Sequence, residues 1–511
     1  MKTNLKRKVV VKKFSLGLLI FVIIILFAGW FFRPVFHSLL MSFYVSPLKV
    51  ILIIAILTGI LLFIKNFGKI LVVQSGPQNY SLKSSKNISP ATIVGFVGLM
   101  IVLGIALNFE SEIRLLITAK KIDYIQKKDL PKFEPVRFIP KQVAKRYADD
   151  TFQNPQEYLG DSQIVMMDGK LKRIFPRLPE GGLLYFFNKL SGFVTVDVDT
   201  LDKKVAIEDQ QFKYAEGIGV FDNLYYKLIQ KKYFVQYSSE PIYLKNDSGE
   251  WVTVVPYIKY EGLLFRIPYW VGVMEIDSEG NITDYTPEEA SNISYLKNNR
   301  IHPKELVNYY VESYSYKNGL LNKWFLHKNQ IETVSLAGSE KIFHVSTSEG
   351  FKQIIVAEPF GRSYGIYKIF VFDATTGKRE IVEFDQNSQL TGPVAAADYI
   401  KREFPTYSWD AFILAEPRPM KIGEDLHWLL SIIPSDAAGI AKTVLFNAKT
   451  NKVTGINTLE EFNTFSKTGI LEESPKNIPS SQNGSLPKTD EIKTKIEEIQ
   501  KQLDSLKELV K

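Results

Sequence analysis

The chain has 511 residues, of which 45% are apolar and 23% are charged, and it contains no cysteine. This composition excludes a disordered chain and a small disulfide scaffold, and the lack of cysteine excludes thiol nucleophiles, iron–sulfur clusters and cysteine-type zinc sites. The net charge is +8, but residues 1–109 hold 12 Lys and Arg and no Asp or Glu, which leaves 51 basic and 55 acidic residues beyond them. Since that larger part has a net charge of −4 and no basic stripe, nucleic acid is not an expected partner.

Three apolar runs in residues 1–109 predict three transmembrane helices. Phe14–Phe32 and Ala91–Phe109 have 19 uncharged residues each, and Val50–Ile64 has 15 but lengthens if Tyr44–Leu48 joins it. A 19-residue helix rises about 28 Å, close to the roughly 30 Å of a bilayer core. A cleaved signal peptide is the alternative for the first run, and a buried core helix is the alternative for the middle run. The expected spans are about 14–32, 46–64 and 91–109.

The Lys and Arg counts of the short connecting segments predict the orientation of these spans. The N-terminal tail has six, the second loop four, and the first loop Arg33 with Lys49 at its edge. Basic residues favour the cytoplasmic side. The expectation is a multi-pass protein of a bacterial cell membrane, with the lipid bilayer as partner, a cytoplasmic N-terminus and extracytoplasmic residues after about 110.

The next segments predict an α+β architecture of tandem modules. Residues 110–139 indicate an amphipathic helix followed by a proline-containing linker. Four units then follow, each read as one helix and an antiparallel sheet of about four strands, at 140–210, 211–300, 301–388 and 389–462. The expected helices are Lys141–Phe152, Asn223–Tyr233, His302–Tyr316 and Val394–Phe404. The last hairpin of each unit turns at an Asp or Asn, whose side chain suits a turn backbone: Asp199, Asp277, Asp373 and Asn447.

The helix, the meander and the closing hairpin together resemble the PepSY-type, cystatin-like repeat of bacterial membrane-anchored envelope proteins. Phe370–Lys378 (FVFDATTGK) carries the resemblance best, and Phe446–Lys452 (FNAKTNK) is a degenerate copy. The similarity spans roughly residues 140–457 in four divergent copies. It implies a non-catalytic envelope module with binding, inhibitory or chaperone-like roles and transfers no catalytic residue.

The C-terminal segments predict a tail that carries an association element. Residues 463–488 are rich in Pro, Ser and Asn, which is typical of a disordered linker. Residues 489–511 place apolar residues at the 4-3 spacing of a coiled coil: Ile492, Ile496, Ile499, Leu503, Leu506 and Val510. This helix predicts a homo-oligomer or a protein partner, and the alternative is docking on its own domain.

Motifs for catalysis or cofactor binding are weak, and no catalytic, cofactor-binding or metal-binding residue is predicted. The G-x-S-x-G match at Gly361–Gly365 precedes a strand, whereas a nucleophile elbow precedes a helix. Gly217 and Gly219 lack the rest of a dinucleotide-binding pattern. The histidines are too far apart to form a recognisable metal motif and are interpreted as structural: His37, His302, His327, His344 and His427.

The expected function is a non-enzymatic scaffold or binding protein of the bacterial envelope that displays its modules and associates through the coiled coil. One alternative is a regulatory or inhibitory subunit of an envelope protease or transporter that engages its target by strand addition. Another is an envelope enzyme whose catalytic carboxylates cannot be paired from the sequence. Aromatic clusters, for example at residues 308–316, add an envelope glycan or peptide as a further ligand class.

Overall fold

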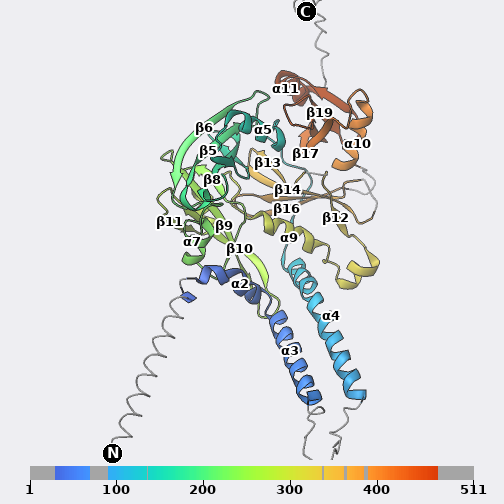
Figure 1. The fold of residues 1–511 in the computed structure, drawn as a ribbon. Helices are drawn as coiled ribbons and strands as arrows, with labels where there is room; N and C mark the ends of the chain where they lie inside the picture. The colour runs from blue at the N-terminus through green and yellow to red at the C-terminus, as the bar shows by residue number, and fades with distance from the viewer. Residues whose placement is uncertain are drawn as a thin grey trace, which may run out of the picture. The chain divides into compact units, whose positions relative to one another are not determined.

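The computed structural model describes residues 29–30, 32–68, 90–134, 136–336, 339–361, 365–384 and 390–469. The chain divides into two compact units, Met1–Asn457 and Thr458–Lys511. The first unit contains four β-sheets and the helices before and between them (Figure 1). In the second unit the described helix is α11 (Leu459–Thr468), which Thr458 caps by accepting a hydrogen bond from the Glu461 amide at 3.0 Å.

The first described elements are helices that pack on one another and on the sheets. They are η1 (Arg33–Phe36), α2 (His37–Val45), α3 (Pro47–Gly68) and α4 (Pro90–Lys121). The C-terminal part of α4 packs on α9 (Lys304–Tyr314), as Figure 1 shows. At this contact Leu115 is buried, and the Thr118 hydroxyl donates to Tyr309 Oη at 3.2 Å. The predicted spans 46–64 and 91–109 fall on α3 and α4, and 14–32 lies almost wholly outside the described residues.

The prediction of three transmembrane helices is wrong. Within the described part of the chain, none of the individual helices has both the length and the apolar character required to cross a bilayer. The pair Arg33–Val45 and Pro47–Leu61 meets the requirement together, but it is bent by 90°. Because of that bend, Tyr44–Leu48 does not extend α3 as a straight helix. The C-terminal part of α4 carries charged residues from Glu110 onward. The predicted multi-pass placement in a bacterial cell membrane, with residues after about 110 extracytoplasmic, depended on those three spans and is therefore also wrong.

Sheets 1 and 2 are antiparallel, and each follows a helix. After α5 (Lys141–Thr151), sheet 1 has the order β2-β4-β5-β6, with β3 also paired to β4; α6 (Leu184–Phe187) lies between β4 and β5. Its strands are β2 (Glu157–Leu159), β3 (Gln163–Met167), β4 (Lys170–Pro179), β5 (Leu190–Asp197) and β6 (Val205–Phe212). After α7 (Leu224–Lys231), sheet 2 has the order β11-β10-β9-β7, with β8 paired to β9; α8 (Pro287–Asn292) follows it. Its strands are β7 (Gln236–Tyr237), β8 (Ile242–Lys245), β9 (Trp251–Glu261), β10 (Ile267–Ile276) and β11 (Ile282–Tyr285).

Sheet 3 follows α9 and the short π-helix η2 (Asn322–Leu326), and sheet 4 follows α10 (Pro393–Glu403). Sheet 3 has the order β1-β16-β15-β14-β12, with β13 paired to β14, and β1 joins β16 in parallel from far upstream. Its strands are β1 (Ile125–Lys127), β12 (Ile331–Thr333), β13 (Phe343–Thr347), β14 (Gly350–Pro359), β15 (Lys368–Asp373) and β16 (Arg379–Glu383). Sheet 4 runs in sequence order through β17 (Phe412–Ile422), β18 (Asp425–Pro434), β19 (Lys442–Asn447) and β20 (Val453–Ile456).

The expected side-chain caps at the hairpin turns are present in three of the four sheets. Asp373 Oδ1 accepts from the Thr375 and Thr376 amides at 3.0 and 2.7 Å, and Asn447 Oδ1 accepts from Lys449 and Thr450, both at 2.9 Å. In sheet 2, Asp277 Oδ1 accepts from the Asn281 amide at 2.8 Å. In sheet 1, by contrast, Asp199 accepts from the Leu171 amide of β4 at 3.3 Å, so there the side chain ties the turn to a neighbouring strand.

The sheets of the first unit share hydrophobic cores. One core joins sheets 1 and 2, where the Phe193 and Trp251 rings lie 4.4 Å apart between centroids. A second core joins α5 and sheet 1 to sheets 3 and 4, for example through Val194, Phe351 and Ile433. A third joins α9, sheet 2 and sheet 3. Burial of the apolar side chains in these three cores is the main force that holds the sheets together, because each Å² of apolar surface removed from water contributes roughly 25 cal/mol.

The predicted linker at 463–488 begins inside a helix, since α11 continues to Thr468. The rest of that linker and the predicted coiled coil at 489–511 lie outside the described residues. The same holds for Ser363 of the G-x-S-x-G match.

Candidate functional site

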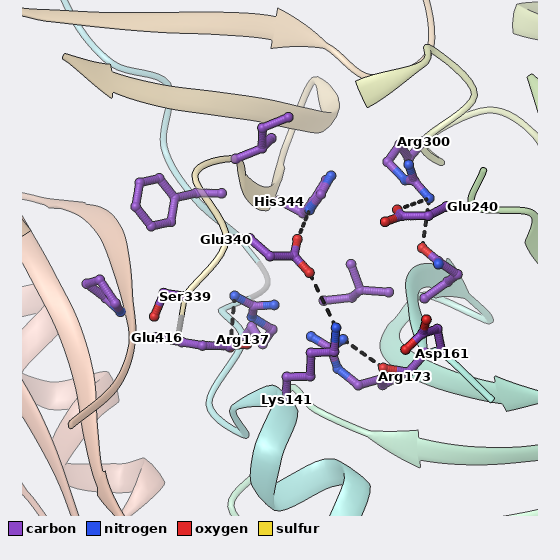
Figure 2. A pocket seen from close by; sticks show the side chains of 16 residues that line it. Arg137, Lys141, Asp161, Arg173, Glu240, Arg300, Ser339, Glu340, His344 and Glu416 are labelled. Carbon is purple, nitrogen blue, oxygen red and sulfur yellow. Dashed lines mark hydrogen bonds and ion pairs between the residues drawn. The ribbon is translucent and has the colours of Figure 1, made fainter. Parts of the chain in front are cut away.

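A cavity of about 100 Å³ lies in the first unit among segments from all four sheets, and ionisable side chains form more than half of its lining (Figure 2). Sheet 1 contributes β3 and β4, sheet 2 the loop between β7 and β8, sheet 3 β13 and the segment before it, and sheet 4 β17. We call it the charged cavity, and its ionisable residues are Arg137, Lys141, Asp161, Arg173, Glu240, Arg300, Glu340, His344 and Glu416.

Glu416 enters the charged cavity from a β-bulge in β17. The register of β17 against β18 shifts between Ala415 and Arg418, and Glu416 has a φ of +37°, a region that few non-glycine residues adopt. Its carboxylate lies 3.2 Å from Nη2 of Arg137, and the two side chains are only 14% and 11% exposed. Burial alone would raise the pKa of Glu416, but Arg137, Arg173 and Arg418 together hold it below its ordinary value. The bulge thus places an ionised carboxylate beside a buried guanidinium.

Glu340 joins sheet 3 to the start of α5. Its carboxylate lies 3.5 Å from Lys141 Nζ and 3.9 Å from His344 Nδ1. Partial burial would raise the pKa of Glu340, but His344 in its protonated form and the cations Lys141, Lys304 and Arg173 outweigh this effect and lower the pKa to about 2. Burial, reinforced by Arg300, lowers the pKa of His344 to about 3, so that the imidazole is neutral at pH 7. Glu340 is therefore ionised at neutral pH and is not available there as a general acid.

Arg300 joins sheet 1 to sheet 2. Its Nη2 donates to Gln163 Oε1 of β3 at 2.7 Å and lies 3.4 Å from Glu240 Oε2, in the loop before β8. Lys304, at the start of α9, forms a second ion pair with Glu240. Burial lowers the pKa of Arg300, which nevertheless remains a cation because an arginine starts from a very high value.

Arg173 is the most enclosed charge contributed by sheet 1. Its Nη1 donates to Ser162 Oγ at 3.1 Å, and its Nε is buried with no partner among the described residues. Burial lowers its pKa to about 10, against the opposing effect of Glu416. A buried cation is tolerated only when opposite charge lies near, so Arg173 makes the position of Glu416 important for stability.

The charges of the cavity compensate one another. The lining holds four Lys or Arg and four Asp or Glu, and His344 is neutral. Ser162 Oγ of the lining accepts from Arg173, and among the described residues neither serine of the lining donates to a histidine or a carboxylate. Within the described residues there is also no group of three or more potential metal-ligating side chains. This arrangement is suited to holding sheets together.

The histidines, the glycine pair and the aromatic stretch considered in the sequence analysis do not come together in one site of the structure. His37 and His427 face backbone carbonyls, at 2.7 Å from Tyr233 O and 3.2 Å from Asp425 O, and His327 lies 2.6 Å from the Gln330 side chain. Burial lowers the pKa of His302 to about 3. Gly217 and Gly219 lie in the loop before α7, and the aromatic stretch 308–316 belongs largely to α9, whose Tyr310 is buried.

Sequence reasoning missed the charged cavity. Its arginines lie at 137, 173 and 300, and their acidic partners at 240 and 416, so no local motif connects them. The signal in the sequence is weak, because β4 contains three further basic residues, Lys170, Lys172 and Arg177, and nothing in the sequence distinguishes Arg173 from them.

The comparisons with known proteins identify no family. No family model matches the sequence, and no curated protein matches it. Among solved structures, an exo-1,5-α-L-arabinanase from a bovine ruminal metagenomic library is similar over 62% of this chain and 83% of its own, with 10% identity and a TM-score of 0.16. That likeness is too low to support an argument about fold or activity.

Proposed function

We propose that the protein is a non-enzymatic binding scaffold, in which the charged cavity fastens the four sheets of the first unit and an exposed surface engages a partner protein. The observation that carries the proposal is the mutual compensation of charge in the cavity, where ion pairs connect segments that lie far apart in the sequence. Catalytic sites keep a poised base or nucleophile free for the substrate, whereas these groups are directed at each other. The helix-and-hairpin resemblance to PepSY-type repeats points the same way and remains a prediction.

An exposed apolar patch formed at α6 and in the loop before α7 is the proposed contact surface. It consists of Leu183, Phe186, Phe187, Val220 and Phe221, which are 48–77% exposed. The Gly219 amide donates to Tyr185 O at 2.8 Å and thereby brings the two loops together. Contiguous exposed apolar side chains on a folded protein commonly mark a site of protein–protein contact. The predicted coiled coil at 489–511 would add self-association or a second partner.

Site-specific photo-crosslinking in cells tests this proposal. A photoreactive residue at position 187 should yield one discrete protein adduct, and the same residue at position 170, at the start of β4, should not. In a competition format, Phe187→Ser should lose the partner while Phe187→Leu keeps it, with unchanged thermal unfolding of both variants. Equal adducts at both positions, or none at position 187, would contradict the proposal.

A second candidate function, hydrolysis through carboxylates, is favoured by one observation. Glu216 and Asp161 line a neighbouring cavity of about 390 Å³ together with Tyr158 and Lys145. Burial raises the pKa of Glu216 to about 7, although Tyr243 donates to it at 3.0 Å. Two carboxyl groups in one cavity, one of them with a raised pKa, fit the pattern of an acid–base pair.

A panel of chromogenic glycosides and peptides separates the two functions. Turnover that Glu216→Gln abolishes and the exposed control Glu180→Gln retains would support hydrolysis. Absence of turnover by the unmodified chain would dismiss it and leave the scaffold.

A further inference from the structure

A second cavity of the first unit differs in character from the charged cavity. It has a volume of about 630 Å³ and lies between α2 and the start of α3 on one side and α7, β7 and β9 on the other. Cavities of roughly 300–1,000 Å³ are typical of sites for small organic ligands. We call it the amphipathic cavity.

The position of α2 creates this cavity. The helix is held at its N-terminal end, where the His37 Nε2 lies 2.7 Å from Tyr233 O and the Arg33 guanidinium donates to Gln230 O at 2.6 Å. At its C-terminal end, the Arg266 guanidinium donates to Tyr44 O at 2.8 Å. Figure 1 shows α2 beside α7 and the β9–β10 pair. Because α2 is fixed at both ends, the space beneath its middle is a feature of the fold.

One part of the lining is apolar. Met41 and Phe43 come from α2, Val50 and Ile53 from α3, and Ile229 from α7. These side chains come from three separate helices and present hydrocarbon to the same space. Such a surface favours an alkyl chain over a water-soluble molecule.

The other part of the lining is polar and positively charged. Ser42 and Ser46 contribute hydroxyls, and Lys49 is the only lysine or arginine in the lining, which contains no Asp or Glu. Among the described residues, Lys49 makes no hydrogen bond or ion pair, in contrast with the cations of the charged cavity. Arg114 of α4, which is not itself a lining residue, donates to Ser46 Oγ at 3.4 Å and brings a second cation next to this part of the lining.

We propose that the amphipathic cavity binds a single-chain anionic amphiphile, with the acyl chain among Met41, Ile53 and Ile229 and the anionic head at Lys49 and Ser46. Apolar burial supplies most of the affinity, and the head supplies orientation through charge-assisted hydrogen bonds. A free fatty acid and a lysophospholipid share this chemistry. This site is separate from the apolar patch of the proposed function, and neither depends on the other.

Photo-labelling of the full chain with a diazirine-bearing palmitate tests the site. Adducts mapped by mass spectrometry should concentrate within residues 37–53 and 225–237. Excess palmitate should suppress them strongly, and methyl palmitate, which lacks the charge, should compete about tenfold less well. Stronger competition by 1-palmitoyl lysophosphatidate than by palmitate would assign the head as a phosphate monoester within the same site.

Variants make the result decisive. Met41→Trp should fill the cavity and reduce labelling at least about fivefold, and Ile53→Trp provides the same test should the first variant not fold. Lys49→Gln should weaken competition by palmitate about tenfold, whereas Lys170→Gln, on sheet 1, should not change it. Labelling spread over the chain, labelling unchanged in both tryptophan variants, or equal competition by palmitate and methyl palmitate would overturn the proposal.

Discussion

The charged cavity and the amphipathic cavity differ in size and in whether their charged side chains are paired. The charged cavity is about 100 Å³ and holds cations paired with carboxylates from distant segments of the chain, whereas the amphipathic cavity is about 630 Å³ and holds one lysine without a paired group among the described residues. Charges that meet in a small enclosed space stabilise the fold only as long as each keeps its partner. A charge that faces open volume is free to meet a ligand. The following predictions test whether this division of roles is real.

Removal of one paired charge from the charged cavity should have the largest effect. Glu416→Gln would leave Arg137, Arg173 and Arg418 without their shared carboxylate. A buried pair that loses one member typically costs about 3–5 kcal/mol of unfolding free energy. Denaturant titration of the full chain measures this loss. Glu424→Gln, an exposed partner of Lys421, is the control and should cost less than about 0.5 kcal/mol; similar losses in both variants would contradict the account.

Acidification should destabilise the chain through His344. Its pKa is about 3 in the folded chain against an ordinary value of 6.5, so between these pH values the unfolded chain binds a proton that the folded chain does not. Stability therefore falls as pH falls through this window, by about 3 kcal/mol from this residue between pH 6.5 and pH 4. His344→Gln should flatten the pH dependence of the unfolding free energy. An unchanged slope in His344→Gln would refute the neutral buried state of His344.

The outer pair of the charged cavity should contribute little. Lys141 and Glu340 lie 3.5 Å apart, but their side chains are 41% and 51% exposed. Exposed ion pairs are worth about 0–1 kcal/mol and are screened by salt. Lys141→Gln should thus lower the unfolding free energy by about 0.5 kcal/mol at low salt and by less at 1 M salt. A loss of unfolding free energy as large as that of Glu416→Gln would show that the burial of an ion pair does not determine its contribution to stability.

The lysine of the amphipathic cavity should matter least for stability. Lys49→Gln removes a charge that has no described partner, so the unfolding free energy should change by less than about 0.5 kcal/mol without ligand. Thermal unfolding without palmitate measures the effect of the substitution on stability, and thermal unfolding with palmitate measures its effect on ligand binding. A large loss without ligand would mean that Lys49 is a structural charge like those of the charged cavity.

Local features of the fold were predictable from the sequence, and the site was not. The turn caps at Asp373 and Asn447 depend on residues two or three positions away, so a local pattern contains the information. The pair Arg137 and Glu416 spans 279 positions, and only the folded core brings its members together. The transmembrane prediction failed for a related reason. Counting apolar residues does not show that the chain bends by 90° between α2 and α3 or that α4 packs on α9.

Hydrogen exchange measured by mass spectrometry on Glu416→Gln tests the central claim most directly. If the charged cavity fastens the sheets, amides of β17 in sheet 4, β13 in sheet 3 and β3–β4 in sheet 1 should lose protection together, because opening then involves them as one cooperative unit. Loss of protection confined to β17, with β13 and β3–β4 unchanged, would show that the cavity does not hold the sheets together.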